Sequence, residues 1–375
     1  MALPLTRALA LLESLAPLAF AESWDNVGLL IEPQLKHEVG RVLFTIDLTS
    51  AVLDEAGQRG AELVVAYHPP IFKGVKRIRA SRNSESVVAG ALARGIAVYS
   101  PHTALDAAPG GVNDWLAETV GQGEVSPLVP LESPGGSEVK LVVFVPSENA
   151  DALREALAAA GAGVIGAYTQ CSFNLAGSGT FFGGEGTDPA VGRAGKLERV
   201  DEIRLEMVCP ARALAAAARA IATVHPYEEP AWDVYPLAPK PALGVGMGRA
   251  VKLATAAPLD ELVRRVKNEL GLSWVRLAAA ERHHRGEPVR RVAVCAGSGG
   301  AVFERAPGFD MVLTGELRHH DVLALNAAGT SVVLCDHTNT ERGYLPRFAR
   351  RLVEASGQAL ECLVSENDRE PLVVV

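Results

Sequence analysis

The chain has 375 residues, enough for two or three domains, and 48% of them are hydrophobic, a share too high for a disordered protein. The 44 acidic and 36 basic residues give a formal charge of −8, which argues against a general nucleic-acid-binding surface because phosphate binding needs clustered Lys and Arg. The five cysteines lie far apart with no CxxC pair, so we expect neither a disulfide framework nor a thiolate zinc site, and we expect a reduced, cytoplasmic protein.

The N-terminal segment predicts an amphipathic helix, because apolar residues recur there at spacings of three or four: Leu5, Ala8, Leu11, Leu12 and Leu15. A signal peptide is the alternative, but Glu13 and Pro17 interrupt its apolar stretch. No apolar run reaches the roughly 18 residues that a membrane-spanning helix needs. We therefore expect a helix of a folded domain and no membrane partner.

Residues 41–106 predict strands alternating with helices. We expect strands at 41–47, 62–70 and 96–100, with helices at 50–60 and 85–94 between them. The second strand ends in Tyr67-His68, and the third leads into His102 and Asp106. Such alternation is typical of βαβ units with a parallel sheet.

The same order recurs near the C-terminus, with strands predicted in residues 290–300, 310–321 and 331–335. The segment LCDHTNTE then matches YSPHTALD, so His337 pairs with His102 and Glu341 with Asp106. Ligand sites in α/β proteins lie at the carboxyl ends of strands. The duplication therefore predicts an α/β protein with a duplicated core of two intertwined half-domains around a metal cleft.

A segment of a different kind separates the halves. It predicts strands at 140–146 and 164–173, a Gly-rich stretch with a short strand, and strands at 202–210 and 231–237, with helices at 150–160 and 211–223. This β-α-β-β-α-β order is typical of a ferredoxin-like domain. Because Pro- and Gly-rich linkers flank this segment, we expect an inserted domain at 133–239 between core halves at 1–132 and 240–375.

The residues at the strand ends suit a divalent metal, namely Tyr67, His68, Asp106, His337 and Glu341. Imidazole and carboxylate ligands favour Zn, Mn, Fe or Ni, and a glutamate can bridge two metals about 3.5–4 Å apart. Taken singly, a histidine after a strand is more often a hydrogen-bonded structural residue. Two equivalent His-Thr-x-x-carboxylate loops favour metal, yet spacing alone leaves both interpretations open.

Several motifs occur in order along both halves and together resemble a known family. They are ESWDNVGLLI, HPPIFKGVKRI, HTALDAAPGGVND, TGELRHHD and HTNTERG. They resemble the GTP cyclohydrolase 1 type 2 homologues, also called the dinuclear metal centre family. The segments AGAGVIGAYTQCSF, GKLERVDEIRLE and HPYEEPAWDVYPL resemble the PII-like or CutA-like insert of longer bacterial members.

The resemblance implies up to two divalent metals per chain and a homo-oligomer, since family members form toroidal hexamers. By position, His68, Asp106 and Glu341 would hold one metal, and His337, Glu341 and the residue at 67 would hold the other. The family usually has histidine where this chain has Tyr67. A phenol with a pKa near 10 must lose a proton to bind a metal, so we expect the second site to be weak or absent.

Three further residues are candidates for contact with a substrate. The resemblance places Glu316 and His320 near the cleft, as acid/base or substrate groups, the alternative being a helix start with a solvated histidine. His102, the counterpart of His337, is a candidate substrate-binding or supporting residue. The GSGG stretch at 297–300 predicts a tight turn rather than a P-loop, because it lacks GK[ST].

Two functions of different classes follow from these features. The first is a metal-dependent hydrolase acting on a small nucleotide-like or phosphorylated substrate; the family name indicates opening of a purine imidazole ring by water. The second is a non-enzymatic metal-binding regulatory or scaffold protein whose insert senses a small-molecule effector. A ring that encloses nucleic acid is a third interpretation, which the acidic charge balance disfavours.

Overall fold

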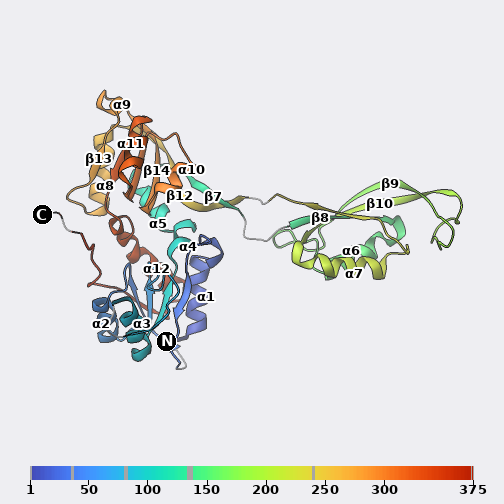
Figure 1. The fold of residues 1–375 in the computed structure, drawn as a ribbon, viewed down its shortest axis with the longest axis horizontal. Coiled ribbons are helices and arrows are strands. Elements are labelled where there is room, and N and C mark those ends of the chain that lie inside the picture. The colour runs from blue at the N-terminus through green and yellow to red at the C-terminus, as the bar shows by residue number, and fades with distance from the viewer. Residues whose placement is uncertain are drawn as a thin grey trace. The chain divides into compact units, whose positions relative to one another are not determined.

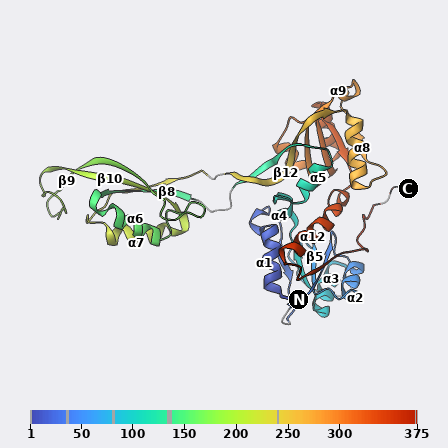
Figure 2. The same cartoon turned by 180° about the vertical axis from the view of Figure 1, so that it is seen from behind.

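The computed structural model describes residues 2–34, 38–79, 83–132, 138–238, 241–372 and 374 (Figures 1 and 2). The chain divides into two compact units, one of Met1–Leu131 with Ala242–Val375 and one of Glu132–Pro241. The expected domain boundaries fall at residues 133 and 239–240, which lie outside the described residues. Each unit is therefore described by itself.

The first sheet of the larger unit has the strand order β17-β4-β5-β6-β2. Its members are β2 (Gly28–Ile31), β4 (Arg41–Thr45), β5 (Leu63–Ala66), β6 (Ala97–Ser100) and β17 (Glu361–Val364). Strands β17, β4, β5 and β6 run parallel, whereas β2 pairs antiparallel with β6. Every residue of β5 and β6 is buried, as expected for parallel strands covered on both faces.

The second sheet repeats this plan, with the order β13-β16-β15-β14-β12-β7. Its members are β7 (Gly123–Glu132), β12 (Pro241–Ala257), β13 (Arg276–Ala278), β14 (Val289–Ser298), β15 (Met311–Glu316) and β16 (Ser331–Leu334). Strands β14, β15 and β16 are parallel, and β13 pairs antiparallel with β16 as β2 does with β6. The duplicated strand order predicted from the sequence is therefore present.

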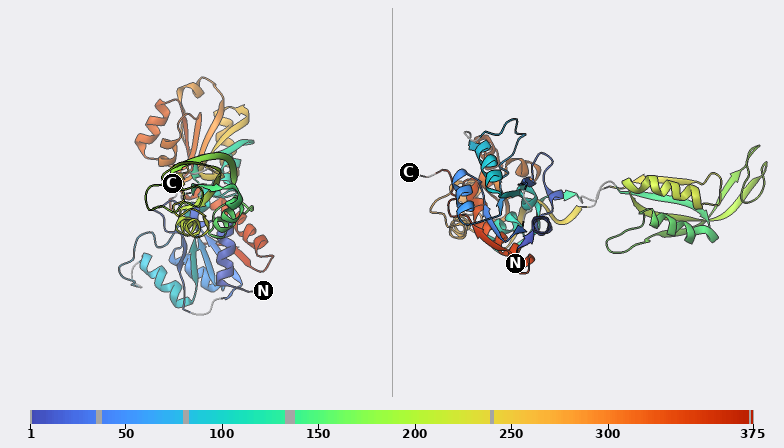
Figure 3. Two further views of the ribbon diagram at one scale, coloured as in Figure 1. Left: turned by 90° about the vertical axis from the view of Figure 1, so that its right-hand side faces the viewer. Right: turned by 90° about the horizontal axis from the view of Figure 1, so that it is seen from below.

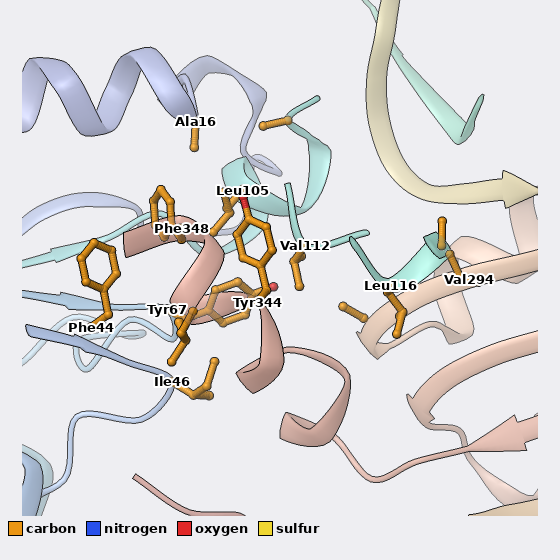
Figure 4. Close-up of a cluster of buried hydrophobic side chains, with 14 of the residues drawn as sticks. Ala16, Phe44, Ile46, Tyr67, Leu105, Val112, Leu116, Val294, Tyr344 and Phe348 are labelled. Carbon is orange, nitrogen blue, oxygen red and sulfur yellow. The ribbon is translucent and has the colours of Figure 1, made fainter. Parts of the chain in front are cut away.

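The two halves exchange elements. The early strand β7 lies in the second sheet, and the C-terminal strand β17 lies in the first. One apolar cluster contains buried side chains of both halves, including Phe44, Leu116, Val294 and Phe348 (Figure 4). Because this cluster is continuous, the ends of strands from both sheets are held against each other.

Helices of the larger unit connect and cover these strands: α1 (Leu5–Leu15), α2 (Ser50–Gln58), α3 (Asn83–Arg94), α4 (His102–Ala107), α5 (Val112–Glu118), α8 (Leu259–Leu270), α9 (Glu281–His284), α10 (Gly300–Arg305), α11 (His319–Ala327) and α12 (Leu345–Ala355). Short 3-10 turns lie at Leu18–Phe20, Thr338–Thr340 and Arg342–Tyr344, and a short pairing joins β1 (Leu3–Pro4) to β3 (Glu38–Val39). The predicted N-terminal helix is confirmed, since Leu5, Ala8, Leu11 and Leu12 are buried on one face of α1. None of the described helices is long and apolar enough to cross a membrane.

The smaller unit has an antiparallel sheet in the order β11-β8-β10-β9. Its strands are β8 (Glu138–Pro146), β9 (Phe173–Phe182), β10 (Leu197–Pro210) and β11 (Trp232–Pro236). Helices α6 (Ala150–Ala159) and α7 (Leu214–Val224) contact each other and lie together on one face of the sheet (Figures 1 and 3).

One strand of this unit was predicted in the wrong place. Residues 164–172 form turns with an isolated bridge between Ile165 and Tyr168, and β9 begins only at Phe173. The short strand predicted in the Gly-rich stretch is present as β9 and is longer than expected, because its backbone pairs with β10 along its length. Pairing supplied by a neighbouring strand outweighs the low strand propensity of glycine here.

Candidate metal centre

The candidate ligands follow two equivalent strands. Tyr67 and His68 continue directly from β5, where their amides donate to the carbonyls of Thr45 and Ile46 at 2.9 and 3.0 Å. His337 and Glu341 flank the 3-10 turn Thr338–Thr340 after β16. These backbone positions fix where each side chain starts.

His68, His337 and Glu341 form one cluster, in which donor atoms of all three lie within 4.8 Å of one another. The two carboxylate oxygens of Glu341 each lie 3.4 Å from an imidazole Nε2, Oε2 from that of His68 and Oε1 from that of His337. The Glu341 side chain is 3% exposed, and the two imidazole centroids are 5.3 Å apart. Glu341 therefore stands between histidines from the two halves.

Each histidine is oriented by a second carboxylate. Nδ1 of His68 lies 2.9 Å from Oδ1 of Asp47, and Nδ1 of His337 lies 2.8 Å from Oε1 of Glu316. With Nδ1 engaged, each ring presents Nε2 to Glu341. Metal-binding histidines are commonly held in this way, since the outer carboxylate fixes the tautomer and makes the ligand more basic.

The charges around His68 favour its protonated form. Burial alone would lower the pKa of His68, but the hydrogen bond to Asp47 and the nearby charges of Glu341 and Asp47 outweigh burial and raise that pKa to about 10. Burial would likewise raise the pKa of Asp47, yet its hydrogen bond to His68 holds that pKa below its usual value. A metal ion that binds His68 must therefore displace a proton.

Two features fit a divalent ion at this cluster. Oε2 of Glu341 is buried without a hydrogen-bond partner among the described residues, because its 3.4 Å contact with His68 lacks hydrogen-bond geometry. A Cβ at Gly297 would lie 2.6 Å from Oε1 of Glu341 and 2.8 Å from Nε2 of His337. A buried carboxylate oxygen that lacks a hydrogen bond and lies beside imidazole nitrogens is part of a donor set suited to Zn or a similar metal.

Tyr67 and Asp106 form a hydrogen-bonded pair beside this cluster, with the Tyr67 ring centroid 5.2 Å from that of His68. The Tyr67 hydroxyl donates to Oδ1 of Asp106, and both side chains are buried. Burial raises the pKa of Tyr67 well above its usual value and that of Asp106 to about 6. The described residues thus bring His68, His337 and Glu341 together, with Asp106 paired to Tyr67. The resemblance implied one metal on His68, Asp106 and Glu341 and a second on His337, Glu341 and Tyr67.

The remaining candidates lie in different surroundings. His102 is half-buried, and its Nδ1 lies 2.8 Å from Oδ1 of Asp25; its ring centroid is 5.4 Å from that of His68. Glu316 contacts His337. His320 is exposed in the first turn of α11, where its ring contacts His319, and the structure does not bring it into the cluster.

Three supporting residues were missed from the sequence. Asp47 comes two residues after β4, so the strand-end rule that identified His68 applies to it equally. Asp25 lies in a motif that was used only for the family resemblance. Gly297 was assigned to a tight turn; its φ of 62° is consistent with that turn, but its lack of a side chain also makes room for Glu341.

Comparison with known proteins agrees with this architecture. The family model Duf34/NIF3 (NGG1p interacting factor 3) matches residues 4–371. NIF3-like protein 1 of Bos taurus is 36% identical over 377 residues, covering 98% of this chain and 92% of that protein. The GTP cyclohydrolase 1 type 2 homolog of Bacillus subtilis is 36% identical over 366 residues, covering 96% of each.

A solved structure shows the same fold. The crystal structure of a Bacillus cereus protein related to NIF3 has a TM-score of 0.72 and 32% identity, covering 100% of this chain and 99% of that one. The mixed α/β architecture with several sheets is thus shared with a member of known structure. From the matched length and these identities, the chain belongs to the Duf34/NIF3 family.

Proposed function

We propose that this protein is a metal-dependent hydrolase acting on a small nucleotide-like or phosphorylated substrate. The observation that carries the proposal is the buried Glu341 carboxylate, which stands between two imidazole Nε2 atoms and has one oxygen without a hydrogen bond among the described residues. The printed name of the Bacillus subtilis relative, GTP cyclohydrolase 1 type 2 homolog, agrees with hydrolytic chemistry on a nucleotide.

The residues of the candidate site have three roles: metal binding, orientation of the imidazoles and proton transfer. His68, His337 and Glu341 bind the metal, which when bound acts as a Lewis acid and lowers the pKa of water. Asp47 and Glu316 hold the two imidazoles with Nε2 facing Glu341. The exposed part of Glu316 is also able to accept a proton from a substrate, and His320 stays a candidate for the same task on the neighbouring helix.

One tight metal per chain is the expected stoichiometry, with Zn, Mn, Fe or Ni as candidates. A second metal, which the resemblance assigns to His337, Glu341 and Tyr67, would require the phenol to lose its proton, and burial opposes that loss. The hydrogen bond from Tyr67 to Asp106 occupies both groups with each other. A second ion is therefore weakly bound.

The smaller unit and the assembly complete the proposal. We assign residues 133–239 to an inserted ferredoxin-like, PII-like domain, a choice supported by the antiparallel order β11-β8-β10-β9 with both helices on one face.

We further propose that the protein is cytoplasmic and forms a homo-oligomer, a toroidal hexamer. Exposed apolar side chains on β9, namely Phe173, Leu175 and Phe182, are consistent with contacts between copies.

A non-enzymatic metal-binding regulator is the second candidate. The tyrosine at position 67 favours it, because a phenol paired with a buried carboxylate leaves fewer ligands for a two-metal reaction. In that case the insert would bind the small-molecule effector.

Turnover separates the two candidates. Protein purified without chelators is assayed for metal content and, after loading with Zn, Mn, Fe or Ni, for hydrolysis of GTP and other nucleotides. Turnover that disappears in Glu341→Gln supports the hydrolase. Metal bound at one ion per chain without turnover of any nucleotide supports the regulator, and no metal after loading contradicts both.

A further inference from the structure

The segment Trp24-Asp25-Asn26 has a structural role that the metal cluster does not explain. The Asp25 side chain is fully buried and accepts hydrogen bonds from the backbone amide and hydroxyl of Thr103, while its Oδ1 lies 2.8 Å from Nδ1 of His102. Asp25 thereby holds the His102 ring in one orientation. With Nδ1 engaged, Nε2 is the nitrogen of His102 left for another partner.

Asn26 ties this segment to the loop that follows β5. Its side-chain amide donates to the carbonyl of Ile71 at 2.5 Å, which places the next residue, Phe72, beside Trp24. The two ring centroids are 6.0 Å apart with the planes tilted by 53°. Both rings meet His102 edge-on, at 6.2 Å from Trp24 and 6.5 Å from Phe72.

Trp24, Phe72 and His102 form a surface that we call the aromatic platform. Trp24 is 58% exposed and Phe72 is 48% exposed, although each offers a large apolar face. Aromatic side chains contribute large contact areas to binding surfaces, and adjacent exposed apolar side chains are a common feature of ligand-binding sites. The platform is also close to the metal cluster, because the His102 ring lies 5.4 Å from that of His68.

Several basic residues come directly after Phe72 of the aromatic platform in the sequence. Lys73, Lys76 and Arg77 are all exposed within five residues of Phe72. Within the described ranges no ion pair engages any of them, whereas Arg79 pairs with Glu85. In a chain of net charge −8, this local excess of cations favours an anionic ligand group.

We propose that the aromatic platform binds a planar aromatic ring of the substrate, and that Lys73, Lys76 and Arg77 bind a negatively charged group, such as a phosphate, attached to it. The ring stacks on Trp24 and meets Phe72 at an angle, because the planes of these two side chains are tilted by 53°. Nε2 of His102 then faces the ring edge nearest the candidate metal cluster. The proposal rests on the proposed function in one respect, namely that the bound ring is the group presented to the metal.

The test is a binding measurement that does not depend on turnover. Isothermal titration calorimetry of the full-length, metal-loaded protein uses adenosine 5′-monophosphate, adenosine and inorganic pyrophosphate as probes. We expect the monophosphate to bind more tightly than either part, with Trp24→Ala and Phe72→Ala each weakening it about tenfold. The double variant Lys76→Ala/Arg77→Ala should weaken it and flatten its salt dependence. Trp24→Tyr should retain most of the affinity.

Two controls keep the result specific. Trp232→Ala removes an exposed tryptophan of β11 and should leave the affinity unchanged. Glu341→Gln should abolish metal binding and turnover while leaving binding of the monophosphate within about threefold, because the platform does not use that side chain. Loss of turnover with retained, Trp24-dependent binding would therefore separate the platform from the hydrolase proposal.

Three outcomes would overturn the proposal. The first is equal binding of the monophosphate by wild type, Trp24→Ala and Phe72→Ala, each shown by metal content and thermal unfolding to be folded. The second is the absence of monophosphate binding to wild type at millimolar concentration. The third is tighter binding of pyrophosphate than of the monophosphate, which would contradict a ring-binding surface.

Discussion

The two halves of the core carry equivalent histidine loops, yet the loops behave differently. His337, after β16, lies with Glu341 in the metal cluster, whereas His102, after β6, is held by Asp25. The carboxylates four residues further on differ as well, because Glu341 keeps an unpaired oxygen and Asp106 accepts from Tyr67. Duplication has thus copied the loops, and residues outside them decide which histidine lies in the candidate metal cluster.

The cause lies in the neighbours of each loop. The first half places Tyr67 beside Asp106, and a bulky phenol there occupies the oxygen that a metal would need. The second half places Gly297 beside Glu341, where even a Cβ would lie 2.6 Å from the carboxylate. The small Gly297 therefore leaves Glu341 available as a candidate metal ligand, whereas the large Tyr67 makes Asp106 a structural hydrogen-bond acceptor.

Replacing the two equivalent carboxylates is the strongest test of this difference. Glu341→Gln should weaken metal binding at least about a hundredfold, because it removes the ligand that joins both histidines. Asp106→Asn should change the metal affinity less than about threefold, since Asp106 lies outside the cluster. Competition with a chromophoric chelator measures both affinities.

The control for Glu341→Gln is its thermal unfolding without metal, which should stay close to that of metal-free wild type. Equal losses of affinity in Glu341→Gln and Asp106→Asn would contradict the assignment. They would support the ligand grouping implied by the family resemblance instead.

The outer carboxylates give the next largest effect. Asp47→Asn and Glu316→Gln should each weaken metal binding by about 10–100-fold, because each orients one ligand histidine. Asp25→Asn serves as the matched variant in the first half, since it orients His102 and should leave the affinity unchanged. A loss of metal in Asp25→Asn comparable to that in Asp47→Asn would place His102 among the ligands.

The duplicated strands and the three residues of the candidate metal cluster, His68, His337 and Glu341, were predictable from the sequence. Parallel strands buried on both faces have continuous apolar runs, and polar side chains directly after them stand out, as His68 and His337 do. The family resemblance then selected these residues over ordinary strand-end histidines.

The grouping of ligands required the structure. Tyr67 and His68 are adjacent in sequence and their ring centroids lie 5.2 Å apart, yet the Tyr67 hydroxyl donates to Asp106 whereas His68 contacts Asp47 and Glu341. Asp47 and Asp25 lie 21 and 77 positions from the histidines they hold, a separation that no local pattern reveals. The misplaced strand at 164–173 had the same origin, since β9 is defined by its pairing with β10.

The pH dependence of metal binding sharpens the comparison further. Because neighbouring Asp47 and Glu341 raise the pKa of His68 to about 10, a metal must displace its proton throughout the neutral range. Affinity should therefore rise by up to about tenfold per pH unit as the pH increases from 7 toward 9. Proton release on Zn binding, measured by calorimetry in buffers of different ionisation enthalpy, checks this.

The metal-free protein should show the opposite trend in stability. A histidine whose pKa is raised by folding contributes fully to the free energy of unfolding below its unfolded pKa of about 6.5, and that contribution is lost as the pH rises toward 10. Asp47→Asn should reduce both trends, because it removes one of the groups that raise the pKa of His68. Unchanged trends in Asp47→Asn would contradict this origin.

The smallest expected effect concerns Tyr67, and it distinguishes a structural pair from a weakened metal site. Tyr67→Phe removes the hydroxyl that donates to buried Asp106, so the free energy of unfolding should fall by about 1–3 kcal/mol while the tight metal stays bound. Tyr67→His supplies a ligand that is already neutral at pH 8, and we expect it to raise the stoichiometry from one metal toward two. Metal analysis and chemical denaturation of both variants measure these changes. If Tyr67→Phe instead releases the tight metal, Tyr67 is itself a ligand, and the first half contributes to metal binding as the second half does.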